Sequence, residues 1–281
     1  MNISSVFICV YLRLGNIMVK DILSQIVAHK KEEVAAARNR LPEARIREQA
    51  MAPRQRRYFL KKLATPGPSG TNIIAEIKRA SPSKGLLCPN LDPAALATEY
   101  ERGGATALSI LTDQAFFKGS VQDLKSAREN TALPVLRKDF LISEYQLFES
   151  ALMGADAVLL IVRILDAEQL KDYMDLCTAL ELDALVEIHS EQDLEAATRA
   201  GARLIGINNR NLRSFDTDIN IAIRMKSLLE PGQIAVAASG IQTRAHIEQN
   251  LRAGIWNFLI GESLVKAQNR NTLLRSLQGE G

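Results

Sequence analysis

The chain has 281 residues, of which 47% are hydrophobic and 24% charged, a composition typical of a soluble globular protein with a large core. Its net charge of +3 is too small to predict nucleic-acid binding, although a local patch can still hold a small anion. Three widely spaced cysteines and three scattered histidines predict no disulfide framework and no metal site, and favour a cytoplasmic location. We expect each histidine at the surface or on a helix.

The first seventeen residues form an unusual segment. Residues 6–12 are apolar, but this run is too short to span a bilayer, and no basic region precedes it and no small-residue cleavage site follows it. Met18 then opens a polar, helix-forming stretch. We therefore expect Met18 to be the natural start, and residues 1–17 to be an upstream-start artefact or a disordered tail.

Residues 18–65 are predicted to form a helical extension. Residues 19–40 carry apolar side chains at helical spacing, and residues 45–63 look like further helix with a strongly basic character. A run of basic residues is usually a solvated face and less often a ligand site; here it comprises Arg54, Arg56, Arg57, Lys61 and Lys62. The Pro- and Gly-rich residues 66–70 are typical of a linker, and we count them as the beginning of the main domain, residues 66–281.

From residue 73 onward, apolar strand-like runs alternate with helical patterns. Several helices begin at a capping residue, such as Asp92, Ser143 or Thr243, and several end in glycine before the next strand. Eight strands alternating with eight helices predict an α/β fold, the (β/α)8 TIM barrel, with the helical extension covering one end. A doubly wound open sheet is the alternative, but no GxGxxG follows the first strand. The expected strands are residues 73–77, 107–111, 134–136, 157–161, 184–188, 204–207, 234–238 and 257–260.

The first strand carries two charged residues. Glu76 and Lys78 are two apart, so a strand places both side chains on one face, just before a polar loop that contains Ser81. Buried charges are costly, so this pair is either a structural ion pair or a catalytic couple. Its position beside a loop favours the catalytic interpretation.

Polar residues follow nearly every predicted strand, at the end of the barrel where active sites form. After the seventh and eighth strands stand Ser239-Gly240 and Gly261-Glu262-Ser263, small residues whose backbone N–H groups can approach an anion. This pattern predicts a phosphate site, and hence a small phosphorylated substrate. No nucleotide-binding motif, metal triad or nucleophile elbow is present.

Seven stretches are distinctive when taken together: IAEIKRASPSKG (74–85), SILTDQAFFKGS (109–120), PVLRKDF (134–140), GADAVLLIV (154–162), LVEIH (185–189), IGINNRNL (205–212) and LIGESL (259–264). Through them the chain resembles the indole-3-glycerol-phosphate synthase family of tryptophan biosynthesis, over residues 19–277. The resemblance implies a (β/α)8 barrel with an added N-terminal helical segment. It also implies a lyase that needs no cofactor and closes the pyrrole ring of 1-(2-carboxyphenylamino)-1-deoxyribulose 5-phosphate, with loss of carbon dioxide and water.

The resemblance also implies residue roles. Lys138 matches the family's acid at the substrate carbonyl, Glu187 its base, and Lys78 and Glu76 partners in positioning or proton transfer, with the division of work between the two lysines left open. Asn208 and Ser239 would orient polar groups of the substrate. The anionic ends would be held by Ser81, Arg210 and the backbone at Gly240, Gly261 and Glu262. Phe116 and Phe117 either pack the anthranilate ring or fill the core.

One position departs from the family pattern, and it keeps alternatives open. Where the family usually reads VAESGI, this chain reads VAASGI, so Ala238 replaces an expected glutamate and we expect slower but real catalysis. A barrel that binds the phosphosugar without turnover is one alternative. Phosphoribosylanthranilate isomerase is another, although no cysteine lies at a strand end as its acid–base pair would require. We expect a monomer or weak dimer, with no obligate partner and no membrane contact.

Overall fold

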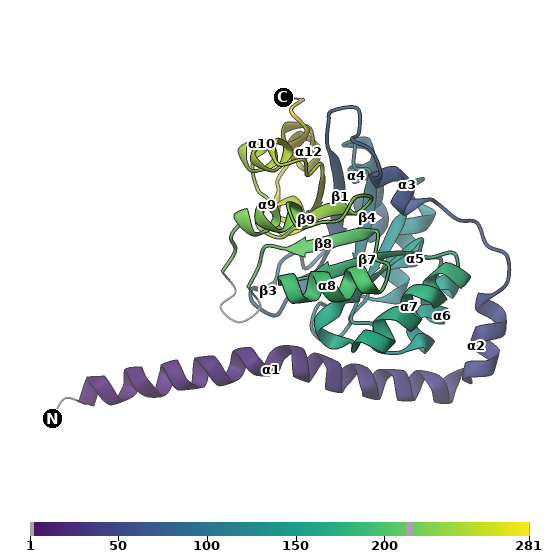
Figure 1. Ribbon diagram of the computed structural model, residues 1–281, viewed down its shortest axis with the longest axis horizontal. Helices are drawn as coiled ribbons and strands as arrows, with labels where there is room; N and C mark the ends of the chain where they lie inside the picture. The colour runs from purple at the N-terminus through teal and green to yellow at the C-terminus, as the bar shows by residue number, and fades with distance from the viewer. Residues whose placement is uncertain (1–2, 212–215, 281) are drawn as a thin grey trace.

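The structure is a computed structural model that describes residues 3–211 and 216–280, with side chains from residue 22 onward. Its centre is a closed barrel of eight parallel strands (Figure 1). Each strand pairs with its neighbours in the chain order, and β1 closes the ring by pairing with the last strand, β10. The barrel strands are β1 (Asn72–Ile77), β4 (Ala107–Leu111), β5 (Val135–Lys138), β6 (Ala157–Ile161), β7 (Asp183–Ile188), β8 (Leu204–Asn208), β9 (Ile234–Ala238) and β10 (Asn257–Ile260). The predicted (β/α)8 barrel is confirmed.

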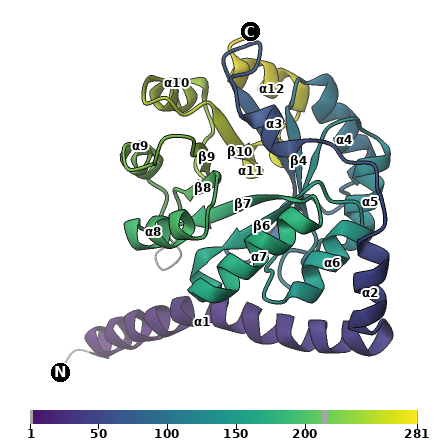
Figure 2. The ribbon, with the colours of Figure 1, turned by 45° about the vertical axis from the view of Figure 1, so that its right-hand side comes forward.

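Helices between the strands cover the outside of the barrel (Figure 2). The predicted caps are confirmed at Asp92, Ser143 and Thr243, whose side chains accept hydrogen bonds from backbone N–H groups in the first turn. Gly104 and Gly154 follow their helices with φ near +85°, as a left-handed residue at this position requires. The outer helices are α4 (Pro93–Arg102), α5 (Val121–Glu129), α6 (Glu144–Leu152), α7 (Ala167–Ala179), α8 (Glu191–Arg199), α9 (Asn220–Lys226), α10 (Arg244–Arg252) and α12 (Arg270–Gln278).

Three short elements lie at the carboxyl ends of the strands. The hairpin of β2 (Ala80–Ser81) and β3 (Gly85–Leu86) follows β1, the turn η1 (Val162–Ile164) follows β6, and α11 (Glu262–Lys266) follows β10. The strand pattern did not predict the hairpin, because two-residue strands are too short to show a period.

The helical extension contacts both ends of the barrel, rather than the one end expected. It consists of α1 (Ile3–Arg40), α2 (Glu43–Ala50) and α3 (Phe59–Leu63). The expected helix over residues 45–63 is interrupted between α2 and α3, where Pro53 disfavours helical backbone in the residue before it. α1 begins at Ile3, so it includes residues 3–17, and the proposed natural start at Met18 stays a prediction. None of the helices in the described ranges is long and apolar enough to cross a membrane.

α3 and the basic segment before it lie at the base of the barrel. Phe59 and Leu63 are fully buried among the side chains of the barrel interior. Arg54 donates hydrogen bonds to the backbone carbonyls of Ala155 (2.8 Å) and Leu180 (3.1 Å), and Arg57 donates to that of Leu133 (2.8 Å). These carbonyls lie in or beside the loops that enter the strands. Both readings of the basic segment were therefore wrong for these arginines, which anchor the extension to the barrel.

Candidate active site

A cavity of about 890 Å³ lies at the carboxyl ends of the strands. Parallel strands in a closed barrel bring all their carboxyl ends to one face, so residues far apart in sequence meet there. The residues given catalytic or phosphate-binding roles from the sequence all line this cavity: Glu76, Lys78, Ser81, Lys138, Glu187, Asn208, Arg210, Ser239, Gly240, Gly261 and Glu262. The roof includes Ile22, Leu23 and Ile26 of α1.

Lys138 and Glu187 form a pair at the ends of β5 and β7. The Lys138 Nζ lies 3.6 Å from the Glu187 Oε2, and the Asn208 amide donates to the other oxygen, Oε1, at 3.3 Å. Burial raises the pKa of Glu187, but the charge of Lys138, a further contribution from His189 and the Asn208 hydrogen bond outweigh burial and lower it below its usual value. The carboxylate is therefore ionised at neutral pH and able to accept a proton, next to an ammonium able to give one.

Glu76 and Lys78 form a second pair at the end of β1. The Lys78 Nζ lies 2.5 Å from the Glu76 Oε1, which confirms that both side chains share one face. Glu76 is 4% exposed and closely packed against the backbone of Gly261, where an added Cβ would lie 2.4 Å from the same oxygen. Gly261 is therefore needed to admit this carboxylate.

The loop after β9 has a left-handed backbone at two successive residues. Ser239 and Gly240 have φ values of 69° and 79°, and a Cβ at Gly240 would lie 2.3 Å from the Thr217 side chain. Glycine is therefore required at residue 240.

The Glu262 carboxylate gathers three cations near this backbone. It accepts hydrogen bonds from Lys84 (2.7 Å) and Lys266 (2.8 Å), and Arg210 lies 3.9 Å away. Burial raises the pKa of Glu262, but the two lysines outweigh it and lower the pKa to about 2. The Glu262 side chain can only repel a phosphate, so any contribution from this residue to binding comes from its backbone.

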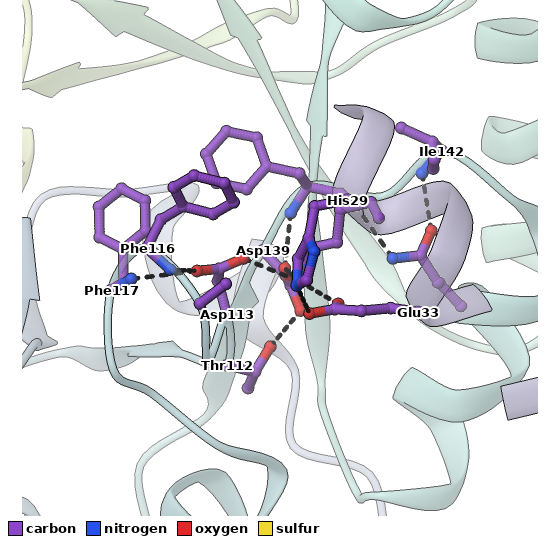
Figure 3. A network of polar contacts seen from close by, with 12 residues as sticks. His29, Glu33, Thr112, Asp113, Phe116, Phe117, Asp139 and Ile142 are labelled. Carbon is purple, nitrogen blue, oxygen red and sulfur yellow. Dashed lines mark hydrogen bonds and ion pairs between the residues drawn. The ribbon is translucent and has the colours of Figure 1, made fainter. Parts of the chain in front are cut away.

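A buried lysine on α1, Lys30, connects the roof of the cavity to its wall, and no sequence pattern predicted it. Figure 3 shows three of the carboxylates around it, those of Glu33, Asp113 and Asp139. Lys30 is 2% exposed, and its Nζ lies 2.7 Å from Glu33, 2.9 Å from Asp113 and 3.0 Å from Asp139. Burial lowers the pKa of Lys30, but the surrounding carboxylates raise it well above its usual value. Asp139 directly follows Lys138, so this cluster fixes the backbone beside the paired lysine.

The two phenylalanines after β4 have different surroundings. The Asp113 carboxylate accepts backbone N–H bonds from Phe116 (2.7 Å) and Phe117 (3.0 Å), which fixes the loop. Phe117 lines the cavity near Phe140, with ring centroids 5.9 Å apart. Phe116 packs edge-to-face against His29 of α1 at 5.8 Å (Figure 3). Of the two, Phe117 is placed to contact an aromatic ring in the cavity.

His189 is neither on the surface nor on a helix, so its predicted position was wrong. Its side chain is 4% exposed, and the ring Nε2 lies 3.5 Å from the Glu187 Oε1. The signal in the sequence was the spacing of two from Glu187, which continues the same strand face. Within the described residues, no group of three His, Cys, Asp or Glu side chains is arranged to hold a metal ion.

Comparison with known proteins identifies the family. The family model described as indole-3-glycerol phosphate synthase matches residues 23–277. The chain belongs to the indole-3-glycerol phosphate synthase family. Indole-3-glycerol phosphate synthase from Desulfosudis oleivorans is 57% identical over 258 residues, which cover 92% of this chain and 98% of the relative. The enzyme from Syntrophobacter fumaroxidans is 52% identical over 259 residues, with the same coverage.

Solved structures of low identity share the fold alone. Thiamine phosphate pyrophosphorylase from Pyrococcus furiosus aligns with a TM-score of 0.57 at 14% identity, over 78% of this chain and 96% of that one. 3-Hexulose-6-phosphate synthase from Salmonella typhimurium aligns with a TM-score of 0.58 at 13% identity, over 74% and 97%. Both likenesses agree with the barrel seen here.

Ala238 is the departure from the synthase family that the structure places in the cavity. It ends β9, is 6% exposed, lines the cavity and stands opposite Asn208 in the strand register. The family match favours neither the isomerase nor a barrel without activity. Ala238 lines the same cavity as the Lys138–Glu187 and Glu76–Lys78 pairs.

Proposed function

We propose that this cavity performs the indole-3-glycerol phosphate synthase reaction with Lys138 and Glu187 as its acid and base. The substrate is 1-(2-carboxyphenylamino)-1-deoxyribulose 5-phosphate, and the products are indole-3-glycerol phosphate, carbon dioxide and water, in tryptophan biosynthesis. The observation that carries the assignment of roles is the 3.6 Å approach of Lys138 to an ionised, buried Glu187. An acid and a base in contact can serve both halves of the reaction.

Ring closure comes first. The aryl carbon that bears the carboxylate attacks the C2′ carbonyl, and the Lys138 ammonium gives a proton to the developing oxyanion. Carbon dioxide then leaves, and its bonding electrons restore the aromatic ring. The Phe117 and Phe140 rings at the cavity wall support an aromatic substrate at this point.

Dehydration follows. The C2′ hydroxyl must leave as water while C1′ loses a proton, so an acid and a base act together. Glu187 takes the C1′ proton, and a lysine protonates the leaving hydroxyl. The Glu76–Lys78 pair lines the same cavity and supplies a second ammonium for that work. Asn208 holds Glu187 in place, and Ser239 orients the substrate's polar groups.

The phosphate is assigned to the loops after β8, β9 and β10. Arg210 and the hydroxyl of Ser81 line the cavity beside the backbone of Gly240, Gly261 and Glu262. Substrate phosphate competes with the Glu262 carboxylate for Arg210, because both are anions. We also infer that the protein acts in the cytoplasm as a monomer or weak dimer and needs no cofactor.

The test is to mix the purified protein with the substrate and follow indole fluorescence, with Lys138→Ala as the control. We expect a rise in the native protein and a rate at least about 100-fold lower in the control, the usual contribution of a general acid. No rise, with tight binding of the product, would favour the barrel without turnover. Neither a rise nor binding would overturn the assignment.

A further inference from the structure

The synthase reaction consumes a proton, and this inference rests on that proposed reaction. Forming the C2′ hydroxyl takes one proton, and its departure as water takes a second. Loss of the C1′ proton returns one, and the carboxylate leaves as carbon dioxide with no proton of its own. Each turnover therefore removes one proton net from the Lys138–Glu187 pair or its neighbours. That proton must come from solvent, although Glu187 is only 6% exposed.

His189 lies next to Glu187 and is not one of the described residues that line the cavity. Its Nε2 is 3.5 Å from the Glu187 Oε1, and its Nδ1 is 4.0 Å from the Asp193 Oδ2. Both ring nitrogens are buried, and neither has a hydrogen-bond partner among the described residues. Leaving two buried polar atoms unpaired is unfavourable, which calls for an explanation beyond packing. Catalytic hydrogen bonds are commonly long before substrate binds, so the two separations fit a path that tightens during the reaction.

Asp193 connects this ring to the surface. Its side chain is 13% exposed, and its Oδ2 accepts hydrogen bonds from the His189 backbone N–H (2.8 Å) and from the Arg163 Nε (3.2 Å). Arg163 is 35% exposed and also lines the cavity. Carboxylate, imidazole and carboxylate thus stand in order from the rim to the paired lysine: Asp193, His189, Glu187, then Lys138.

We propose that His189 relays protons from the rim at Asp193 to Glu187, and so restores the proton that each turnover removes. One proton enters the ring at Nδ1 and one leaves from Nε2 to the Glu187 Oε1. The carboxyl group of Glu187 then rotates about its Cγ–Cδ bond and passes that same proton to the Lys138 amine, so that Glu187 is again ionised. The imidazole is neutral before and after the transfer, and rotation of the ring between turnovers returns its N–H to the side of Glu187.

The charges around the ring suit this task. Burial lowers the pKa of His189, Glu187 and Asp193 act to raise it, and Arg163 and Lys138 act to lower it, so that the net change is downward. The ring is therefore neutral at pH 7, with one nitrogen able to accept a proton and the other able to donate.

Two variants test the relay, because each distinguishes the loss of proton transfer from a change in side-chain packing. His189→Gln keeps an N–H donor toward Glu187 but cannot pass a proton on. His189→Ala opens space that free imidazole can fill. We expect kcat to fall about tenfold or more in both variants, with KM within about twofold of the native value, since general acid–base steps are worth at least that much. Added imidazole should restore kcat of His189→Ala in a saturable way and leave the native enzyme unchanged.

The measurements distinguish failure of the relay from failure of the proposed function. If the native enzyme forms no indole product, the synthase assignment fails and the relay fails with it. If the native enzyme is active and His189→Gln keeps its kcat, His189 has no part in proton transfer. A lower kcat in His189→Ala that imidazole does not restore, with native product binding as the check on folding, would likewise overturn the relay.

Discussion

Removing the charge of Lys30 should both loosen the roof of the active site and lower the free energy of unfolding of the protein. In Lys30→Met, Asp113 and Asp139 would stay buried without the ammonium that now lies about 3 Å from each. Truncating one partner of a buried ion pair costs about 3–5 kcal/mol. Both carboxylates keep other hydrogen-bond donors. Asp113 keeps a backbone N–H group, and Asp139 keeps the Thr112 hydroxyl and the Arg137 guanidinium. We therefore expect a loss of unfolding free energy at the lower limit, about 3 kcal/mol.

The pH dependence of this loss follows from two pKa values. The raised pKa of Lys30 means that its contribution is fully present below the usual value of 10.5 and disappears only as pH rises through the folded value. The lowered pKa of Asp139 means that its contribution is present above 3.8 and is lost as pH falls through the folded value. The difference in stability between native and Lys30→Met should therefore be constant from pH 6 to pH 9, roughly, and shrink in acid.

The assay combines denaturant unfolding with steady-state kinetics. Lys31→Met is the matched control, because Lys31 is the neighbouring lysine and is exposed. We expect Lys30→Met to raise KM as well, since Ile22, Leu23 and Ile26 of the same helix line the cavity. Trypsin should also cut α1 faster in Lys30→Met. If Lys30→Met matched Lys31→Met in stability, KM and cleavage, the view of Lys30 as the tether of the roof would be refuted.

Three further predictions concern other parts of the molecule. Ala238→Glu, which restores the family glutamate, should raise kcat by about tenfold, or 1.4 kcal/mol, and shift its pH profile; an unchanged rate and profile would mean that the position is unimportant. Glu262→Gln should lower KM for the phosphorylated substrate about threefold, because Lys84 and Arg210 lose a competing carboxylate; inhibition by inorganic phosphate gives the same comparison without turnover. Arg54→Met should lower the free energy of unfolding in denaturant by about 2–3 kcal/mol and leave KM unchanged, because buried carbonyls at the base of the barrel lose their hydrogen-bond donor. Its control is Lys62→Met, in the exposed part of the same segment, and equal stabilities of the two variants would contradict the assignment.

Local patterns in the sequence were enough to predict the barrel and the polar residues at the ends of its strands. Strand and helix periods are local properties, and so are a cap at Asp92 and a left-handed glycine at residue 104. Parallel strands that close into a ring place all their carboxyl ends on one face, so a polar residue that ends a strand belongs to the site wherever it lies in the chain. This is why Glu76 and Glu187 could be assigned to one cavity without any contact being known.

Which charged side chains are buried, and which partners they have, became known from the folded structure alone. Lys30 looks like any lysine of an amphipathic helix, and it becomes buried because α1 lies across the mouth of the barrel beside Asp113 and Asp139. Arg54 lies in a basic run typical of a solvated face, yet it binds carbonyls 101 and 126 residues away in sequence. The buried position of the His189 side chain results from packing of the loop after β7 against η1 and α8. The burial and pairing of a charged or titratable group depend on contacts between distant segments, and no local period records them.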